Sequence, residues 1–388
     1  MSLYTTAAPV TITCHKRLAP YLEAEVKELG FEIEDTFVTG VRIKASINDC
    51  IKLNLNLRCA SQVLYSLKQF QAYNADDIYQ GLSGFPWETI LHPEGYFSVT
   101  SNVLNDTINN SMFANLRVKD AIVDRLRTKT GKRPSTGAEL VGAVVHLFWK
   151  NEHAEVFVDT SGDSLARHGY RKIPGRAPML EALAAATIMA TKWDRKSPFV
   201  NPMCGSGTVA IEAALIATDT RPGVFRTNYA FMHLQGYDEN VYLEERGALE
   251  RKIKEDADVR IIATDYSDMA ITNARKNALA AGVADLIEFS VCDFAETPVP
   301  EGGGVVYLNP EYGERLGDVQ ELEETYARIG DFMKQKCKGY HGYIFTGNLE
   351  LAKKIGLKAS RRIEFYTSTI DCRLLEYELY AGTRRTDA

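Results

Sequence analysis

The sequence has 388 residues, of which 45% are apolar and 25% charged, a composition typical of a globular chain with two or three domains. Its formal net charge of −6 argues against general polyanion binding, so nucleic acid would have to meet a local basic face. We find no apolar run long enough to span a membrane, and the first residues lack the pattern of a signal peptide. Seven cysteines without a CxxC pair favour a reducing cytoplasm and argue against a disulfide framework or a zinc ribbon, and we expect no metal site.

Residues 1–68 have the pattern of a small α+β module of ferredoxin-like type. Alternating apolar residues predict short strands, and apolar positions that repeat every three or four residues predict two helices. The expected strands are 10–14, 31–33, 36–38, 41–44 and 62–67, and the expected helices are 18–29 and 47–55.

Residues 69–163 form the second expected module, with a strand at 96–100, a long helix at 111–128 and a hairpin at 141–159. Basic residues gather in and after the long helix, which in an acidic chain indicates a face that follows nucleic-acid phosphates. A solvated helix face is the alternative, and the two have even odds from these residues alone. The cations are Arg117, Lys119, Arg125, Arg127, Lys129, Lys132 and Arg133.

Residues 164–388 alternate strand and helix patterns, which predicts an α/β fold with a doubly wound, mostly parallel sheet. A polar stretch with glycines at 162–176 is expected to be the hinge into this module, and residues 219–239 read as an insertion. The expected strands are 199–200, 260–264, 286–289, 304–308, 342–345, 363–366 and 374–380.

This last module is organised around a glycine-rich turn between a short strand and an apolar helix. Such a frame binds nucleotide-like ligands, because glycines allow close approach of the backbone and the helix start offers free N–H groups. The lysine of a P-loop is missing, and no acid ends a strand about 20 residues later, as a dinucleotide site requires. The turn consists of Asn201, Pro202, Met203, Cys204, Gly205, Ser206, Gly207 and Thr208.

Two acids follow successive predicted strands. Asp265, with Tyr266 beside it, is placed to accept hydrogen bonds from ribose hydroxyls. Asp293 could accept from an adenine amino group, with Phe294 beside the ring. Each acid alone would favour a helix cap, but their joint placement favours a nucleoside pocket.

The fourth predicted strand ends in Asn309, Pro310, Glu311 and Tyr312. The Asn309 Oδ1 and the Pro310 carbonyl could accept both hydrogens of an exocyclic amine and aim its nitrogen at a methyl donor. Tyr312 could stack on a flipped base. A plain Asn-Pro turn is the alternative, and it is less consistent with the neighbouring signals.

With these motifs the sequence resembles the bacterial THUMP-domain RNA methyltransferases, in particular the family that forms N2-methylguanosine in large-subunit (23S) rRNA. That family reads D-P-x-C-G-S-G-T where this chain has residues 201–208, and N-P-P-Y-G-E-R-L where it has residues 309–316. Residues 159–171, 353–362 and 370–377 extend the resemblance over nearly the whole chain.

The resemblance implies a ferredoxin-like module at 1–68, a THUMP domain at 69–163 and a class I, Rossmann-like methyltransferase domain at 164–388. It implies S-adenosylmethionine as the cofactor, bound by the 201–208 loop, Asp265 and Asp293. It implies catalysis by Asn309, Pro310 and Tyr312, with Glu311 between them. It favours RNA as the partner of the basic helix, and we add the hinge residues Arg167 and Arg171 to that expected contact.

The chain departs from the family pattern at three places. Asn201 replaces an acid, Glu311 replaces a proline, and residues 166–168 replace His-Lys-Arg. One hypothesis is that the Glu311 carboxylate compensates for the acid missing at 201, because a sulfonium prefers nearby negative charge. We expect His168 to be structural, and Cys204 and Cys292 to be packing residues.

The function expected from the sequence is methylation of a guanine N2 in 23S rRNA. A tRNA guanine-N2 methyltransferase is the nearest alternative, followed by a non-catalytic RNA-binding or ribosome-assembly factor that keeps the cofactor fold. A DNA or protein amine methyltransferase shares the catalytic loop but normally lacks the N-terminal modules. A nicotinamide dehydrogenase is disfavoured by the position of Asp265.

Overall fold

The structure is a computed structural model, and it describes residues 3–105, 111–173, 178–312, 319–368 and 370–380. The chain divides into two compact units. Unit 1 comprises Met1–Cys14, Leu22–Leu165 and Pro222–Leu249, and unit 2 comprises His15–Tyr21, Ala166–Arg221 and Glu250–Ala388.

Unit 1 is built on one eight-stranded sheet in the order β2-β3-β1-β4-β8-β7-β5-β6. Its strands are β1 (Ala8–Thr13), β2 (Ile33–Phe37), β3 (Gly40–Ala45), β4 (Gln62–Gln71), β5 (Tyr96–Leu104), β6 (Ser135–Thr136), β7 (Ala143–Lys150) and β8 (His153–Asp159). Strand β4 pairs antiparallel with β1 on one side and with β8 on the other. The two N-terminal modules therefore share a single continuous sheet.

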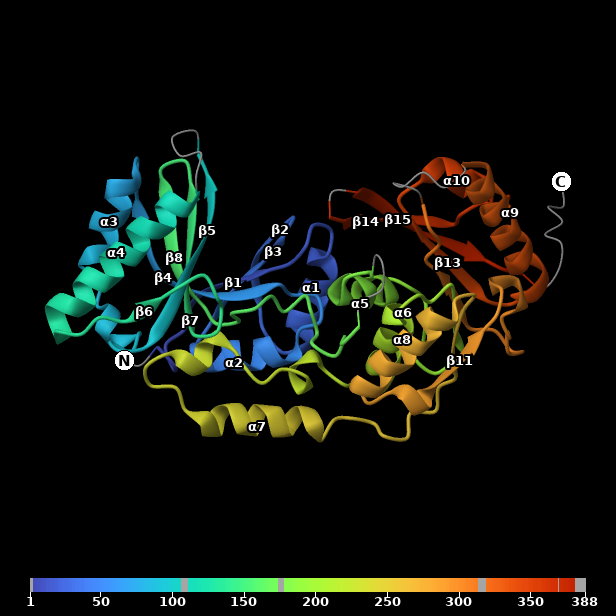
Figure 1. Cartoon of the computed structure of the whole chain (residues 1–388), viewed down its shortest axis with the longest axis horizontal. Coiled ribbons are helices and arrows are strands. Elements are labelled where there is room, and N and C mark those ends of the chain that lie inside the picture. Colours follow the sequence, from blue (N-terminus) through green and yellow to red (C-terminus); the bar gives the residue numbers. More distant parts are fainter. Residues whose placement is uncertain (1–2, 106–110, 174–177, 313–318, 369, 381–388) are drawn as a thin grey trace. The chain divides into compact units, whose positions relative to one another are not determined.

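The helices that lie wholly or mostly in unit 1 are α1 (Ala19–Glu28), α2 (Ile47–Asn56), α3 (Ala75–Ser83), α4 (Ser111–Thr130) and α7 (Glu239–Glu250). Capping boxes begin α2 at Ser46 and α3 at Asn74, where each side chain accepts backbone N–H bonds that the first turn leaves free. Helices α3 and α4 lie side by side (Figure 1).

Residues 222–249, which the sequence placed in the last module, belong to unit 1 by their contacts. A Cβ at Gly223 would lie 2.5 Å from the Leu55 carbonyl oxygen, so only glycine permits this close approach to α2. The rings of Tyr229 and Phe231 stack with their centroids 5.1 Å apart. Because backbone bonds from this segment also reach residues 90, 160 and 161, it completes the packing of unit 1.

Unit 2 contains a seven-stranded sheet in the order β11-β10-β9-β12-β13-β15-β14. Its strands are β9 (Phe199–Pro202), β10 (Ile261–Asp265), β11 (Ile287–Val291), β12 (Val305–Leu308), β13 (His341–Thr346), β14 (Arg361–Thr367) and β15 (Ile370–Glu378). The first five run parallel, and β15 is antiparallel to both of its neighbours. The predicted α/β fold with a mostly parallel sheet is confirmed.

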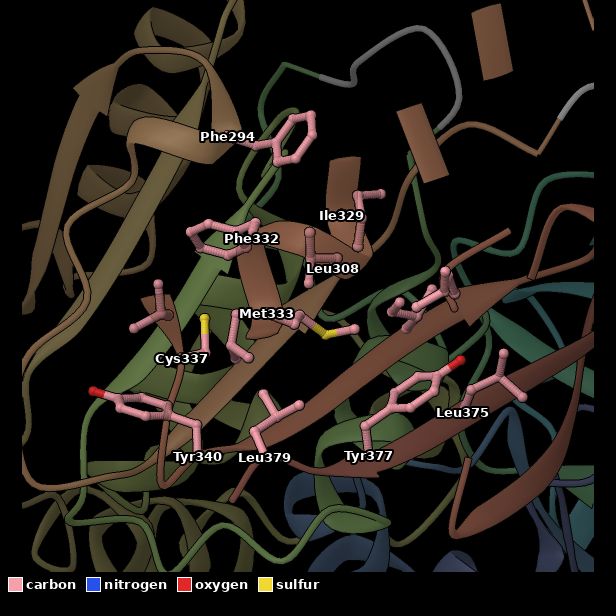
Figure 2. Close-up of a cluster of buried hydrophobic side chains, with 14 of the residues drawn as sticks. Phe294, Leu308, Ile329, Phe332, Met333, Cys337, Tyr340, Leu375, Tyr377 and Leu379 are labelled. Atoms are coloured by element: carbon pink, nitrogen blue, oxygen red, sulfur yellow. The ribbon is translucent and has the colours of Figure 1, made fainter. Parts of the chain in front are cut away.

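Helices cover both faces of this sheet. They are α5 (Glu181–Met189), α6 (Thr208–Ala217), α8 (Asp268–Ala280), α9 (Val319–Lys336) and α10 (Leu349–Lys353). Figure 2 shows the core on the α9 face, where Leu308 of β12 packs with Ile329 and Phe332 of α9. The preceding residue, Tyr307, points to the opposite face, where its hydroxyl donates to Thr187 of α5 at 3.0 Å.

Candidate functional site

The predicted site residues meet at the carboxyl edge of the unit 2 sheet. Strand β9 lies between β10 and β12, so the chain leaves β9 at the point where the strand order changes direction. The backbone pairing of β9 with β12 stops at Val200 opposite Val306, whereas its pairing with β10 continues to Pro202 opposite Thr264. Strands β9 and β12 therefore separate just where the glycine loop, residues 201–208, begins.

The glycine loop has three residues with positive φ: Met203 (+59°), Gly205 (+56°) and Gly207 (+84°). A Cβ at Gly207 would lie 2.9 Å from the Cβ of Ala274, whereas the space beside Gly205 is open to 4 Å. The backbone N–H of Cys204 donates to the Thr264 carbonyl at 2.9 Å. The loop is thus held tightly on its β10 side and has free space at Gly205, and all eight of its residues are buried or half-buried.

Asp265 is largely buried, and both of its carboxylate oxygens accept from backbone. Its Oδ2 accepts from Gly205 N at 2.9 Å, and its Oδ1 accepts from Ser267 N at 3.0 Å. Ser267, rather than Asp265, caps α8. The geometry gives Asp265 a role in fixing the glycine loop, while Tyr266 beside it is 79% exposed.

Asp293 lies in a different environment, at the exposed start of a short helical turn. Its Oδ1 accepts from Ala295 N at 2.9 Å and from the guanidinium of Arg328 at 2.7 Å. The bond from Arg328 lowers the pKa of this carboxyl. Here the helix-capping alternative describes the geometry. Phe294, which we expected beside an adenine, instead lies in the core with Phe332 (Figure 2).

Asn201 and Asn309 each hold a buried oxygen without a hydrogen-bond partner among the described residues. The Asn201 Nδ2 donates to the Tyr307 carbonyl at 2.8 Å, which leaves its Oδ1 as the unpaired atom. Asn309 follows directly on β12, and its Oδ1 is also unpaired. Both oxygens could accept from N–H groups of a ligand, but buried atoms elsewhere, such as Asn54 Oδ1 and Ser98 Oγ, also lack a partner among the described residues.

The rest of the predicted catalytic segment surrounds Asn309. Pro310 is buried, Glu311 is exposed, and Tyr312 is half-buried. A Cβ at Gly347 would lie 3.0 Å from two ring carbons of Tyr312 and 2.8 Å from a methyl group of Ile370. Gly347 therefore provides the space in which the Tyr312 ring lies. Residues 313–316, which contributed to the family pattern, lie outside the described residues.

Most of a polar network that lies next to the glycine loop was not predicted from the sequence. Arg171 was expected to contact RNA, but its guanidinium donates to Thr208 Oγ1 at 3.0 Å and lies 3.4 Å from Glu181 of α5. Asn277 of α8 accepts from two backbone N–H groups of the hinge and donates to the Ser206 carbonyl at 3.2 Å. Asn277 therefore fastens both the hinge and the loop to α8, and Arg171 links the hinge to α5 and to the start of α6.

His168 and Glu212 form a second pair in this network. Both are fully buried, and the His168 Nδ1 lies 2.8 Å from the Glu212 carboxylate. The expectation that His168 is structural agrees with this position. A single glutamate inside the apolar helix α6 was the available signal for the pair, because a buried acid requires a partner. Cys204 is buried too, and burial raises the pKa of its thiol.

The seven cations of the second module divide into two groups. Arg125 makes two bonds to Glu88 and Arg117 makes one to Asp76, while the other paired cations are Lys119, with Asp120, and Lys132, with Glu94. In the described part of the chain, no hydrogen bond or ion pair engages the other three, and all are exposed: Arg127, Lys129 and Arg133. Arg167 in the hinge is exposed as well.

Two features are absent from the described ranges, 3–105, 111–173, 178–312, 319–368 and 370–380. None of the helices described is long and apolar enough to cross a bilayer. Within the same ranges, no three His, Cys, Asp or Glu side chains gather in a way that could hold a metal ion.

Three family models match the chain. Residues 168–376 match the RMKL-like methyltransferase domain, residues 10–64 the RlmL ferredoxin-like domain, and residues 72–159 the THUMP domain. The first of these models covers more than half of the chain.

Known proteins are similar over almost the full chain. A ribosomal RNA large subunit methyltransferase K/L of Syntrophotalea carbinolica is 36% identical over 95% of this chain, but the match covers 53% of that protein. A candidate RNA methyltransferase of Synechocystis sp. is 30% identical, with 97% of this chain and 98% of that protein covered. A candidate methyltransferase crystallised with S-adenosylhomocysteine (SAH) superposes with a TM-score of 0.89 at 26% identity, covering 98% of this chain and all of that one.

Proposed function

Because the chain belongs to the RMKL-like methyltransferase family, we propose that it transfers a methyl group from S-adenosylmethionine to the exocyclic N2 of a guanine in large-subunit (23S) rRNA. The observation that carries this proposal is the buried Oδ1 of Asn309 at the end of β12, which has no hydrogen-bond partner among the described residues. The chain spans about half the length of the large-subunit rRNA methyltransferase from Syntrophotalea carbinolica, so the substrate is part of the proposal.

The glycine loop and its surroundings fit S-adenosylmethionine. The open space at Gly205 admits a ligand close to the backbone. The exposed ring of Tyr266 can cover an adenine at the end of β10. The SAH-bound relative, which is similar along its whole length, supports the same ligand class.

The catalytic segment would present the amine. When bound, S-adenosylmethionine supplies a methyl group on a positively charged sulfur. Asn309 Oδ1 and the Pro310 carbonyl accept the two N–H bonds of guanine N2, which turns its lone pair towards the methyl group. After the new C–N bond forms, one N–H proton leaves, so no strong base is required. Tyr312 stacks on the flipped base from its place against Gly347.

RNA would be held by unit 1 through its THUMP domain. Arg127, Lys129 and Arg133 of α4 and its following loop are exposed and make no hydrogen bond or ion pair within the described ranges, so they can meet phosphates. Arg167 adds a further exposed cation in the hinge. We also propose a cytoplasmic location, because the proposed substrate is ribosomal RNA.

The test is methyl transfer from labelled S-adenosylmethionine to protein-free rRNA and to tRNA, prepared separately from a strain that lacks this gene. The RNA is digested and its nucleosides are identified. We expect label in N2-methylguanosine from 23S rRNA. Label in tRNA alone would show that the substrate is tRNA and not rRNA. SAH binding without label in either RNA would indicate a non-catalytic RNA-binding factor.

A further inference from the structure

Asn201 occupies the point at which β9 and β12 separate. One pair further along the ladder, the Tyr307 carbonyl has no strand partner on the β9 side. The Asn201 Nδ2 fills that place with a bond of 2.8 Å, so a side chain continues the connection that the backbone ends. Only a donor can do this, because the partner is a carbonyl oxygen.

The bond also anchors the upstream end of a strained loop. Met203 adopts a positive φ that non-glycine residues rarely hold, at a cost of about 1 kcal/mol or more, so its surroundings must fix it. Downstream, the loop is fixed by the Cys204 bond to β10, by Asp265 on Gly205 and by Asn277 on Ser206. Upstream, Asn201 provides the side-chain anchor, and it leads directly to the catalytic strand.

We propose that Asn201 is a positioning residue whose amide fastens the glycine loop to the end of the catalytic strand β12, a role that a carboxylate cannot fill. The family pattern has an acid here, so the asparagine is a functional feature of this chain and not the loss of one. The inference rests on the proposed function, because it takes SAH to be a ligand of the glycine loop.

A carboxylate at 201 would face the Tyr307 carbonyl without a proton to donate. Asn201 is 1% exposed, and Asp265 lies at the end of the adjacent strand, so burial and a neighbouring acid both oppose a negative charge. Asn201→Asp would therefore bond to Tyr307 only while its carboxyl is protonated. Because burial raises the pKa of such a group, the variant is expected to improve relative to wild type as the pH falls.

The experiment compares wild type, Asn201→Asp and Asn201→Ala in the full chain. SAH affinity is measured by calorimetry and thermal unfolding by calorimetric scans, both from pH 5.5 to 8.5. Asn56→Asp is the matched control, because Asn56 is buried in unit 1 and its Nδ2 also donates to a backbone carbonyl at 2.8 Å.

We expect Asn201→Asp to bind SAH about tenfold more weakly than wild type at pH 8, with most of the loss recovered at pH 5.5. Asn201→Ala should lose affinity to a similar extent at every pH, and Asn56→Asp should lower Tm while leaving SAH affinity within about twofold of wild type. Wild-type affinity of Asn201→Asp at pH 8, or a loss that does not change with pH, would overturn the inference.

The two proposals fail differently. Wild-type SAH binding without methyl transfer to RNA contradicts the proposed function and leaves the role of Asn201 intact. Unchanged SAH binding in Asn201→Asp contradicts the inference while methyl transfer continues.

Discussion

The carboxyl edge of the unit 2 sheet and helix α4 of unit 1 both carry clusters of polar residues, but the clusters differ in kind: amides and carboxylates at the edge, and mainly cations on α4. At the sheet edge, Asn201 and Asn309 keep buried acceptors unpaired among the described residues. On α4, Arg117 and Arg125 are engaged by acids of their own unit. The comparison teaches that the number of charges alone does not indicate a binding site, because cations can be engaged by acids of their own unit.

The largest expected effect at the sheet edge is that of Asn309→Ala. Removal of the proposed acceptor for the target amine should lower kcat by about 10²–10³-fold, because a preorganised hydrogen bond acts on the developing charge. Single-turnover methyl transfer to RNA measures this loss. SAH affinity should stay within about threefold of wild type. A loss of SAH affinity as large as the loss of rate would show that Asn309 supports the cofactor rather than the amine.

Substitution of the two acids expected to bind the nucleoside should reduce SAH affinity to different extents. Asp265→Ala removes the acceptor of two backbone N–H groups, one of them in the glycine loop, and should weaken SAH binding about 30-fold. Asp293→Ala, at an exposed carboxyl paired with Arg328, should weaken it less than about threefold. Calorimetric titration with SAH measures the affinity of both variants. Equal losses for the two variants would restore Asp293 to the cofactor site.

An intermediate effect is expected from Gly347→Ala. The added methyl group would meet the Tyr312 ring and Ile370, so the ring must shift and kcat should fall about tenfold. Gly84→Ala is the control, because no atom lies within 4 Å of its Cβ position and its φ is not in the left-handed region. Methyl-transfer rates of both variants are measured with saturating RNA. An unchanged rate in Gly347→Ala would remove Tyr312 from the catalytic segment.

The smallest effects are expected on α4 and its following loop. Arg127→Ala and Arg133→Ala should each weaken RNA binding about threefold and lower the salt dependence of the affinity by about one counterion. Arg125→Ala should leave that slope unchanged, because its guanidinium is held by Glu88. Binding titrations at several salt concentrations measure the slopes. A reduced slope in Arg125→Ala would mean that RNA competes with Glu88.

The elements of unit 2 could be predicted from the sequence because strand and helix periods are local properties. The glycine loop, Asp265 and Asn309 could be proposed as site residues for the same reason: each lies at the end of a strand or directly after it. Phe294 was misplaced because its distance from Asp293 along the chain does not reveal that its ring turns into the core. Arg171 and Asn277 form contacts across many residues, and no local pattern predicts these.

The segment at residues 222–249 has a consequence for how such a chain is inherited. It is encoded inside the methyltransferase match at 168–376 but packs within unit 1. A gene exchange that cut the reading frame at the hinge would hand over the ferredoxin-like and THUMP modules without Tyr229, Phe231 and the close contact at Gly223. Recombination can therefore pass on the two units together much more readily than it can shuffle them separately.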